Sequence, residues 1–280
     1  MQKKYAFALI ALAAILMTVS CQNKGAQSGK ANEAIIAVAD RNGALPGKFS
    51  VNDTKQVQFS RGNLYWDGSA FKFEDNQYDF PTSWDKSHVG HFFWSNNASA
   101  AYNSKYIDNK VNSGNIASSY IFFTNEADTT AQSNFIVNGV QGRYRMLSST
   151  EWAYLRYSRT NASSLYKCGV TVCGKANCLI LAPDDFSGTI ASAYDASSWP
   201  AAEAAGLVCL PAAGTRSGSD ILSAGKFGSY WTSTAYDYSS MYCLFIYSDN
   251  VYHDYRDGLF SGNSVRLITS LCCCDSLYIH

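Results

Sequence analysis

The sequence contains, at residues 142–152, the run Gly142-Arg143-Tyr144-Arg145-Met146-Leu147-Ser148-Ser149-Thr150-Glu151-Trp152. Within it, Ser148 precedes Glu151 by three residues, which is the spacing of a capping box. In a capping box each side chain accepts a hydrogen bond from the backbone N–H of the other residue. Trp152 and Leu155 then supply one apolar face for the turns that follow. The run therefore predicts a helix that begins at Ser148.

Upstream of this run, polar and apolar residues alternate in two pairs of short segments. The first pair is residues 48–51 and 56–60, and the second is residues 63–66 and 70–73, joined through Asp67-Gly68. Alternation with a period of two places the apolar side chains on one face of a strand, and Asp-Gly is typical of a tight turn. We predict two β-hairpins in this region.

Downstream of the run, the pattern predicts a buried strand and a second helix. Residues 179–181 are apolar and are followed by a turn at Asp184-Asp185, and residues 198–203 begin a helix with Pro200 in its first turn. Residues 78–138 show no sustained period and are predicted to be mainly loops. The expected fold class is α+β, with two helices, several short antiparallel strands and long irregular loops.

The N-terminus has the pattern of an export signal. Lys3 and Lys4 precede an apolar run over residues 5–19, which is shorter than a membrane-spanning helix. Cys21 directly follows the small residue Ser20 and resembles the lipidated cysteine of a bacterial lipoprotein signal. The resemblance implies an outer-membrane lipoprotein, held to the membrane by lipid on Cys21, at the cell surface or on the periplasmic face. An ordinary cleaved signal is the alternative.

The rest of the chain divides into a tether, a domain and a tail. Residues 22–42 are small and polar and predict a flexible tether. Residues 43–268 are long enough to form a single domain with a large core. Residues 269–280 form a Cys-rich tail, and its triplet Cys272-Cys273-Cys274 fits a disordered tail, an intermolecular disulfide or a frameshift.

Composition argues against several kinds of partner. Lys and Arg together number 22, as do Asp and Glu, so the chain has no basic field for nucleic acid. His88 and His91 have no carboxylate or cysteine beside them at ligand spacing, so neither a metal nor another cofactor is expected. Cys168, Cys173 and Cys178 recur every five residues, which fits no zinc pattern. Two interpretations of these three cysteines are open. Either two of them form a disulfide, or they are small residues in buried and turn positions.

The 142–152 run also resembles the R-L-P-x-x-x-E-W element of the C-type-lectin-like fold that is shared with formylglycine-generating enzymes. Three later strings resemble, in the same order, the closing strands of bacterial surface lipoproteins of the major paralogous domain type. These strings are residues 210–216, 228–234 and 264–268. The resemblance implies a C-type-lectin-like domain, although the chain continues beyond Ile268, where similar chains end.

Some members of that family are variable proteins of diversity-generating retroelements, in which adenine-directed mutagenesis rewrites a C-terminal segment. The resemblance places this segment at residues 235–263, called here the Tyr-rich stretch. AAC codons randomised at both adenines never yield Lys, Glu, Gln or Trp. The stretch contains none of the four, although the composition of the chain would give about three. A turn-rich strand segment would also lose some of them.

The Tyr-rich stretch predicts a binding face of the kind found in antibody loops. Tyr provides a large contact area with little rotamer entropy to lose, and Ser, Asn and Gly adapt their hydrogen bonds. The positions expected to be exposed and to contact ligand are Tyr236, Asp237, Ser239, Ser240, Cys243, Phe245, Tyr247, Tyr252, Asp254, Tyr255, Arg256, Asp257 and Phe260. The positions expected to be framework are Tyr242, Leu244, Ile246 and Val251. Trp231 is expected to anchor the core, and Arg266 to pair with a buried carboxylate or carbonyl.

The function expected from these observations is non-enzymatic binding of an unidentified protein or glycan on another cell, a phage or a host surface. A non-diversified structural or fimbria-associated subunit is the alternative. Enzymatic activity like that of the oxidase with this fold is disfavoured, because Cys209 and Cys243 lie outside that family's motif context. The sequence also has no hydrolase, metalloprotease or nucleotide-binding motif. The tripeptides with which C-type lectins bind calcium are absent too.

Overall fold

The computed structural model describes residues 43–93, 136–237, 240–259 and 261–271. These residues belong to one compact unit, Asp40–His280. The predicted signal, tether, lipidation site Cys21 and Cys triplet lie outside the described residues, as do Ser239 and Phe260. No helix in the described part of the chain is long and apolar enough to cross a membrane.

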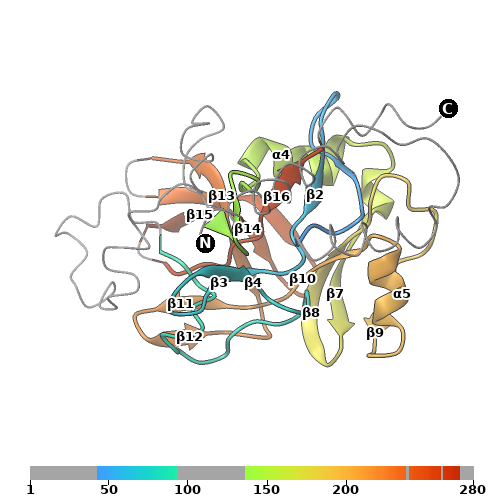
Figure 1. Cartoon of the computed structure of the whole chain (residues 1–280). Helices are drawn as coiled ribbons and strands as arrows, with labels where there is room; N and C mark the ends of the chain where they lie inside the picture. Colours follow the sequence, from blue (N-terminus) through green and yellow to red (C-terminus); the bar gives the residue numbers. More distant parts are fainter. Residues whose placement is uncertain (1–42, 94–135, 238–239, 260, 272–280) are drawn as a thin grey trace, which may run out of the picture. The chain divides into compact units, whose positions relative to one another are not determined.

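Short strands dominate the described residues, together with two short α-helices, and this confirms the α+β class (Figure 1). The helical segments are α4 (Ser149–Ala153), which continues as a π-helical turn (Tyr154–Ser158), a 3-10 turn (Ala162–Ser164) and α5 (Trp199–Ala204). The first eight strands are β1 (Phe49–Ser50), β2 (Gln56–Phe59), β3 (Leu64–Trp66), β4 (Phe71–Phe73), β5 (Ile136–Val137), β6 (Val140–Gln141), β7 (Tyr166–Val172) and β8 (Lys175–Leu181). The others are β9 (Ala193–Tyr194), β10 (Val208–Leu210), β11 (Thr215–Ser217), β12 (Asp220–Leu222), β13 (Gly228–Ala235), β14 (Ser240–Ile246), β15 (Val251–Gly258) and β16 (Ile268–Ser270).

The local predictions made from turn and cap residues are confirmed. Strands β1 and β2 form the first hairpin, and β3 and β4 form the second. Pro200 lies in the first turn of α5. Asp184-Asp185 forms a turn after β8. These elements are set by neighbouring residues, which is why sequence patterns locate them.

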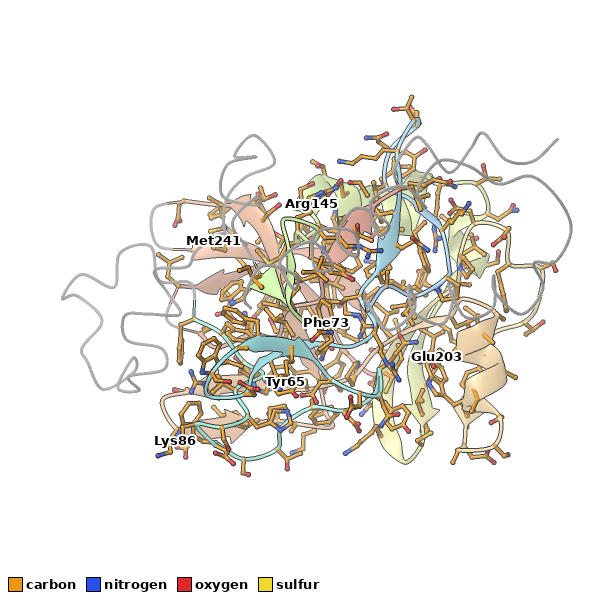
Figure 2. All side chains as sticks on the ribbon, in the orientation of Figure 1. Tyr65, Phe73, Lys86, Arg145, Glu203 and Met241 are labelled. Atoms are coloured by element: carbon orange, nitrogen blue, oxygen red, sulfur yellow. The ribbon has the colours of Figure 1, made fainter. Side chains whose placement is uncertain are left out.

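Helix α4 begins at the predicted capping box. The Ser148 hydroxyl accepts a hydrogen bond from the Glu151 backbone N–H at 3.1 Å, and the Glu151 carboxylate accepts one from the Ser148 backbone N–H at 3.0 Å. Two guanidinium nitrogens of Arg145, labelled in Figure 2, donate to the same carboxylate at 2.6 and 2.7 Å. Backbone hydrogen bonds join Arg145 to Ile268, so the start of the helix is tied to β16.

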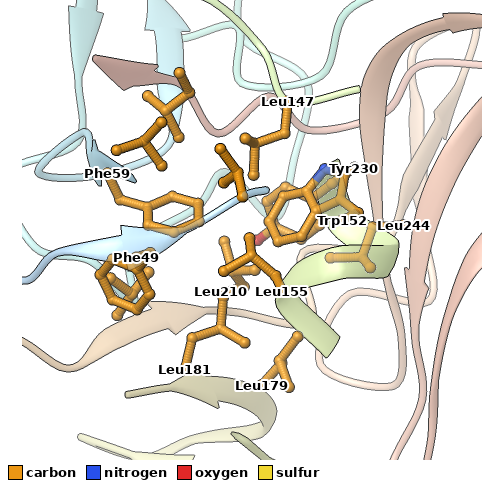
Figure 3. Close-up of a cluster of buried hydrophobic side chains, with 14 of the residues drawn as sticks. Phe49, Phe59, Leu147, Trp152, Leu155, Leu179, Leu181, Leu210, Tyr230 and Leu244 are labelled. Atoms are coloured by element: carbon orange, nitrogen blue, oxygen red, sulfur yellow. The ribbon is translucent and has the colours of Figure 1, made fainter. Parts of the chain in front are cut away.

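Among the residues that the structure describes, three clusters of buried side chains make up the core. The principal members of the first core, shown in Figure 3, are Phe49, Phe59, Trp152, Leu155, Tyr230 and Leu244. Those of the second core are Leu64, Phe71, Phe92, Trp231, Met241 and Cys243. Those of the third core are Val170, Cys178, Ile180, Trp199, Leu207 and Cys209. Because successive side chains in a strand point to opposite faces, β13 separates the first core from the second, and β8 separates the first from the third.

The two histidines are loop residues, as predicted, and they have different partners. His88 Nε2 lies 2.6 Å from a carboxylate oxygen of Glu74, while the buried His91 contacts the carbonyl oxygen of Ala213 at 2.9 Å. Burial lowers the pKa of His91 to about 4, so its ring is neutral at pH 7. Within the described ranges, no three His, Cys, Asp or Glu side chains are grouped so that they could hold a metal ion.

The His88–Glu74 pair makes the stability of the fold depend on pH. The hydrogen bond to Glu74 raises the pKa of His88 above its ordinary value of 6.5. The pair therefore stabilises the fold fully below that value, and its contribution is lost as the pH rises through the raised pKa. We expect His88→Gln to cost about 0.5 kcal/mol near pH 5.5 and almost nothing near pH 8.5. The effect is small because the His88 side chain is 42% exposed.

Urea unfolding of the native chain and of the His88→Gln variant at both pH values measures this difference in the free energy of unfolding. The substitution Lys86→Gln, two residues away and exposed, serves as the control and should show no such pH dependence. An equal loss for His88→Gln at both pH values contradicts the assignment.

Candidate binding surface

The Tyr-rich stretch forms β14 and β15, two strands of a three-stranded antiparallel sheet with the order β13-β14-β15 (Figure 1). Between β13 and β14, the Tyr236 backbone N–H donates to the carbonyl of Ser240 at 3.1 Å, and the Ser240 hydroxyl donates to the carboxylate of Asp237 at 2.9 Å. Between β14 and β15, the Tyr247 backbone N–H donates to the carbonyl of Asn250 at 2.8 Å. The stretch therefore contains the β14–β15 hairpin, and hydrogen bonds close the ends of the connections on both sides of β14.

Segments that are far apart in the sequence meet at β13 and support this hairpin. The Ser233 backbone N–H donates to the carbonyl of Leu147 at 2.9 Å, which attaches the 142–152 run to the strand. The Trp231 backbone N–H donates to the carbonyl of Ser264 at 3.0 Å, and a parallel bridge joins Gly214 to the first residue of β13. The run and the three strings that carry the family resemblance thus lie side by side.

Both faces of the sheet are covered over part of their area. Residues paired directly across antiparallel strands share a face, so Cys243 and its partner Tyr255 lie on one face, and Tyr242 and its partner Arg256 lie on the other. Cys243 belongs to the second core, and the next residue, Leu244, belongs to the first. Solvent therefore reaches the stretch mainly along β15, the outer strand, and at the turns.

Most of the predicted contact positions reach solvent. The exposed ones are Tyr236, Asp237, Tyr247, Tyr252, Asp254, Tyr255 and Arg256, and the partly exposed ones are Ser240, Phe245 and Asp257. Seven large hydrophobic side chains are exposed in the described residues, and four of them are tyrosines of this stretch, each between 44% and 49% exposed. Exposed apolar area is thus concentrated in a short part of the chain.

One group of rings lies on the Tyr242 side of the sheet. The rings of Tyr236 and Tyr242 meet edge to face with their centroids 5.3 Å apart. The Arg256 guanidinium lies 4.2 Å from the centroid of Tyr236, which is the geometry of a cation–π contact. These contacts hold the exposed Tyr236 ring in one place.

A second group lies on the opposite side of the sheet. Phe245 stacks on Tyr255 with centroids 4.6 Å apart and an interplanar angle of 28°. Phe227, just before β13, contacts Phe245 at 5.0 Å. Phe227 lies outside the Tyr-rich stretch and was not predicted, because only the pairing of β13 with β14 brings it close. The aromatic surface is therefore divided between two faces.

Two predicted orientations within β14 are wrong. Cys243, expected to be exposed, is fully buried because it pairs with Trp231 and enters the second core with it. Burial raises the pKa of its thiol to about 12, so the reactive thiolate form is suppressed. Tyr242, expected to be framework, is partly exposed and packs on Tyr236. The expected framework positions Leu244, Ile246 and Val251 are buried, as predicted.

Asp257 is engaged within its own loop. Its carboxylate accepts hydrogen bonds from the Gly258 backbone N–H at 2.9 Å, from the Asn263 side chain at 3.0 Å and from the Ser261 hydroxyl. These bonds hold the connection that follows β15. Asp257 is partly exposed and its carboxylate has partners in its own loop, so its role as a contact position stays a prediction.

The expectations for Trp231 and Arg266 are confirmed. Trp231 is buried and its indole N–H donates to the carbonyl of Phe92 at 2.7 Å. The guanidinium of Arg266 is also buried and donates to the carbonyl of Cys209 at 3.2 Å and to the side-chain oxygen of Gln77 at 2.8 Å. Burial lowers the pKa of Arg266 to about 10, so the group remains a cation at neutral pH.

A small apolar cavity lies beside the sheet between α4, β8 and the β14–β15 hairpin. It is lined by Trp152, Leu155, Arg156, Tyr166, Leu179, Leu181, Leu244 and Val251. Its volume of about 10 Å³ has room for roughly one water molecule. The exposed rings, and not this cavity, therefore offer the area that a large ligand needs.

No protein-family model, no curated protein and no solved structure matches the chain.

Proposed function

We propose that this chain is a non-enzymatic, lipid-anchored surface protein that binds a protein or glycan ligand through the Tyr-rich stretch of a C-type-lectin-like domain. The observation that carries the proposal is the concentration of exposed tyrosine, because four of the seven large hydrophobic side chains that are exposed among the described residues belong to this stretch. Exposed tyrosine side chains supply large contact areas at binding surfaces such as antibody loops. The order of the family-like strings and their convergence on β13 support the proposed fold.

The arrangement of the rings suits binding. A side chain that is already ordered loses less entropy when a ligand binds. Stacking on Phe245 orders Tyr255, and the contact with Arg256 orders Tyr236. Tyr252 and Tyr255 are exposed on β15, which is the edge strand of the described sheet. A ligand can therefore approach β15 from the side that β14 does not cover. A ligand that covers β15 would contact both tyrosines.

We propose further that the exposed positions of this stretch are diversified by adenine-directed mutagenesis. The absence of Lys, Glu, Gln and Trp from the stretch supports this origin. The test is the neighbouring DNA. A reverse transcriptase gene beside a near-copy of the coding stretch that differs only at adenines is expected, and a locus without either contradicts diversification while leaving the binding proposal intact.

The binding proposal is tested with the full-length protein in detergent against two probes, a printed array of defined glycans and a displayed library of random peptides. We expect specific binders whose affinity falls at least about tenfold in the double variant Tyr252→Ser, Tyr255→Ser. Leu222→Ser, an equally exposed apolar position on β12, is the control and should bind as the native chain does.

Two results contradict the binding proposal. One is the absence of any specific binder from both probes. The other is binding that survives the double variant but is lost in Leu222→Ser, because the ligand would then contact β12. Circular dichroism spectra of the two variants show whether each remains folded.

A further inference from the structure

Three of the five described cysteines meet in the third core. Cys178 in β8 and Cys209 in β10 are fully buried there, and Cys173 packs at its edge. Cys168 packs against the first core, on the other side of β7 and β8. The repeated five-residue spacing therefore does not bring Cys168 and Cys178 together. The Cys178 thiol donates to the carbonyl oxygen of Lys175 at 3.4 Å, and Cys209 approaches it from a distant strand.

The register of the sheet fixes how Cys178 and Cys209 approach each other. Cys209 lies directly opposite Ile180, and Cys178 precedes Ile180 by two residues in the same strand. Residues two apart share a face, so the two thiols are diagonal neighbours on the face that covers the third core. After burial, the hydrogen bond with the Cys178 side chain is the strongest cause that raises the pKa of the Cys209 thiol, which reflects their proximity.

We propose that Cys178 and Cys209 form a structural disulfide when the chain folds under oxidising conditions. Each thiol gives up its hydrogen and one S–S bond forms. The two electrons and two protons pass to a disulfide oxidant, such as oxidised glutathione, which is reduced to two thiols. Diagonal neighbours are about 7 Å apart between Cα atoms, slightly beyond the usual disulfide span, so the bond draws the strands together by about 1 Å. Strand β10 has three residues and lies at the edge of its sheet, so the shift involves a short strand, whose Cys209 backbone also bonds with Gln77 and Arg266.

The bond forms during folding and is then shielded. Thiolate is the form that attacks a disulfide, and burial disfavours it, most clearly by raising the pKa of Cys209. A folded, reduced chain should therefore react slowly with an oxidant, while a chain that folds in the presence of the oxidant should be crosslinked before the third core closes.

The test is refolding of the denatured, reduced full chain in a mixture of reduced and oxidised glutathione, followed by alkylation and digestion with trypsin and a glutamate-specific protease. These enzymes separate the relevant thiols. Cys178 is in the peptide 176–203, Cys209 is in 204–216, and Cys168 and Cys173 are together in 168–175. We expect a crosslink between 176–203 and 204–216, lighter by two hydrogen atoms than the two peptides together.

Matched variants and the melting temperature complete the test. Cys178→Ser and Cys209→Ser should each abolish this crosslink, while Cys243→Ser, a buried thiol of the second core, should retain it. The oxidised chain should melt roughly 5–10 °C above the reduced chain, since the bond closes a loop of about 30 residues. Full alkylation of Cys178 and Cys209 after refolding, or a crosslink between 176–203 and 168–175, overturns the proposal.

Discussion

Replacing Trp231 with alanine is expected to lower the free energy of unfolding by about 3–5 kcal/mol. The indole is 1% exposed and lies among the side chains of the second core. Truncation leaves a cavity where a rigid ring had packed, and neighbouring side chains fill such a cavity only in part. It also removes the buried hydrogen bond from the indole N–H to the carbonyl of Phe92, which adds to the cost although the same carbonyl still accepts from the Asn263 backbone N–H.

Denaturant unfolding monitored by circular dichroism measures this loss. Tyr247→Ala is the matched control, because Tyr247 is an aromatic residue of the adjoining turn that is 49% exposed. Its replacement should change stability by less than about 0.5 kcal/mol. A loss of under about 1 kcal/mol in Trp231→Ala would show that the second core does not depend on this ring.

Elements that depend on neighbouring residues could be predicted from the sequence. The capping box at Ser148 and the Asp67-Gly68 turn each involve residues that are close in sequence. The structure has the helix that the capping box predicts and the hairpin that the turn predicts. Leu244, Ile246 and Val251 are buried as predicted, because Leu, Ile and Val are among the residue types that are most often buried. The α+β class follows from these elements alone.

Features that depend on the pairing of distant segments could not be predicted. The alternation rule assumes one wet and one dry face, but the first and second cores cover opposite faces of β14. Polarity therefore does not reveal which way Cys243 and Tyr242 point. In the pairing of β14 with β15, the step from Cys243 to Phe245 faces the three-residue step from Tyr255 to Tyr252, which shifts the alternation of β15 by one residue. Phe227 joins the aromatic surface only through that three-dimensional arrangement.

Replacing Cys243 with tyrosine is expected to destabilise the domain by about 3 kcal/mol or more. Tyrosine is among the residues that randomised AAC codons yield, so diversification at this position would produce the change. The Cys243 side chain is fully buried against Trp231. A phenol ring there overpacks the second core, and its hydroxyl is carried into an apolar site where burial without a partner is costly.

The matched change is Tyr255→Cys, the reverse substitution at the position that pairs with Cys243 across β14 and β15. Tyr255 is 46% exposed, so its replacement should lower the free energy of unfolding by less than about 1 kcal/mol. The same replacement should lower the affinity for any ligand that the stretch binds. Melting temperatures of the two variants distinguish the positions. Equal tolerance at both would mean that burial does not restrict variation in β14.

Such a contrast bears directly on the proposed function. Residues of a binding face can be substituted freely only where their side chains project into solvent, because a core position restricts the volume and polarity of its side chain. The exposed tyrosines of β15 meet this condition, whereas the buried Cys243 does not. If diversification occurs, natural copies of this chain should therefore vary at Tyr252 and Tyr255 and keep a small side chain at Cys243.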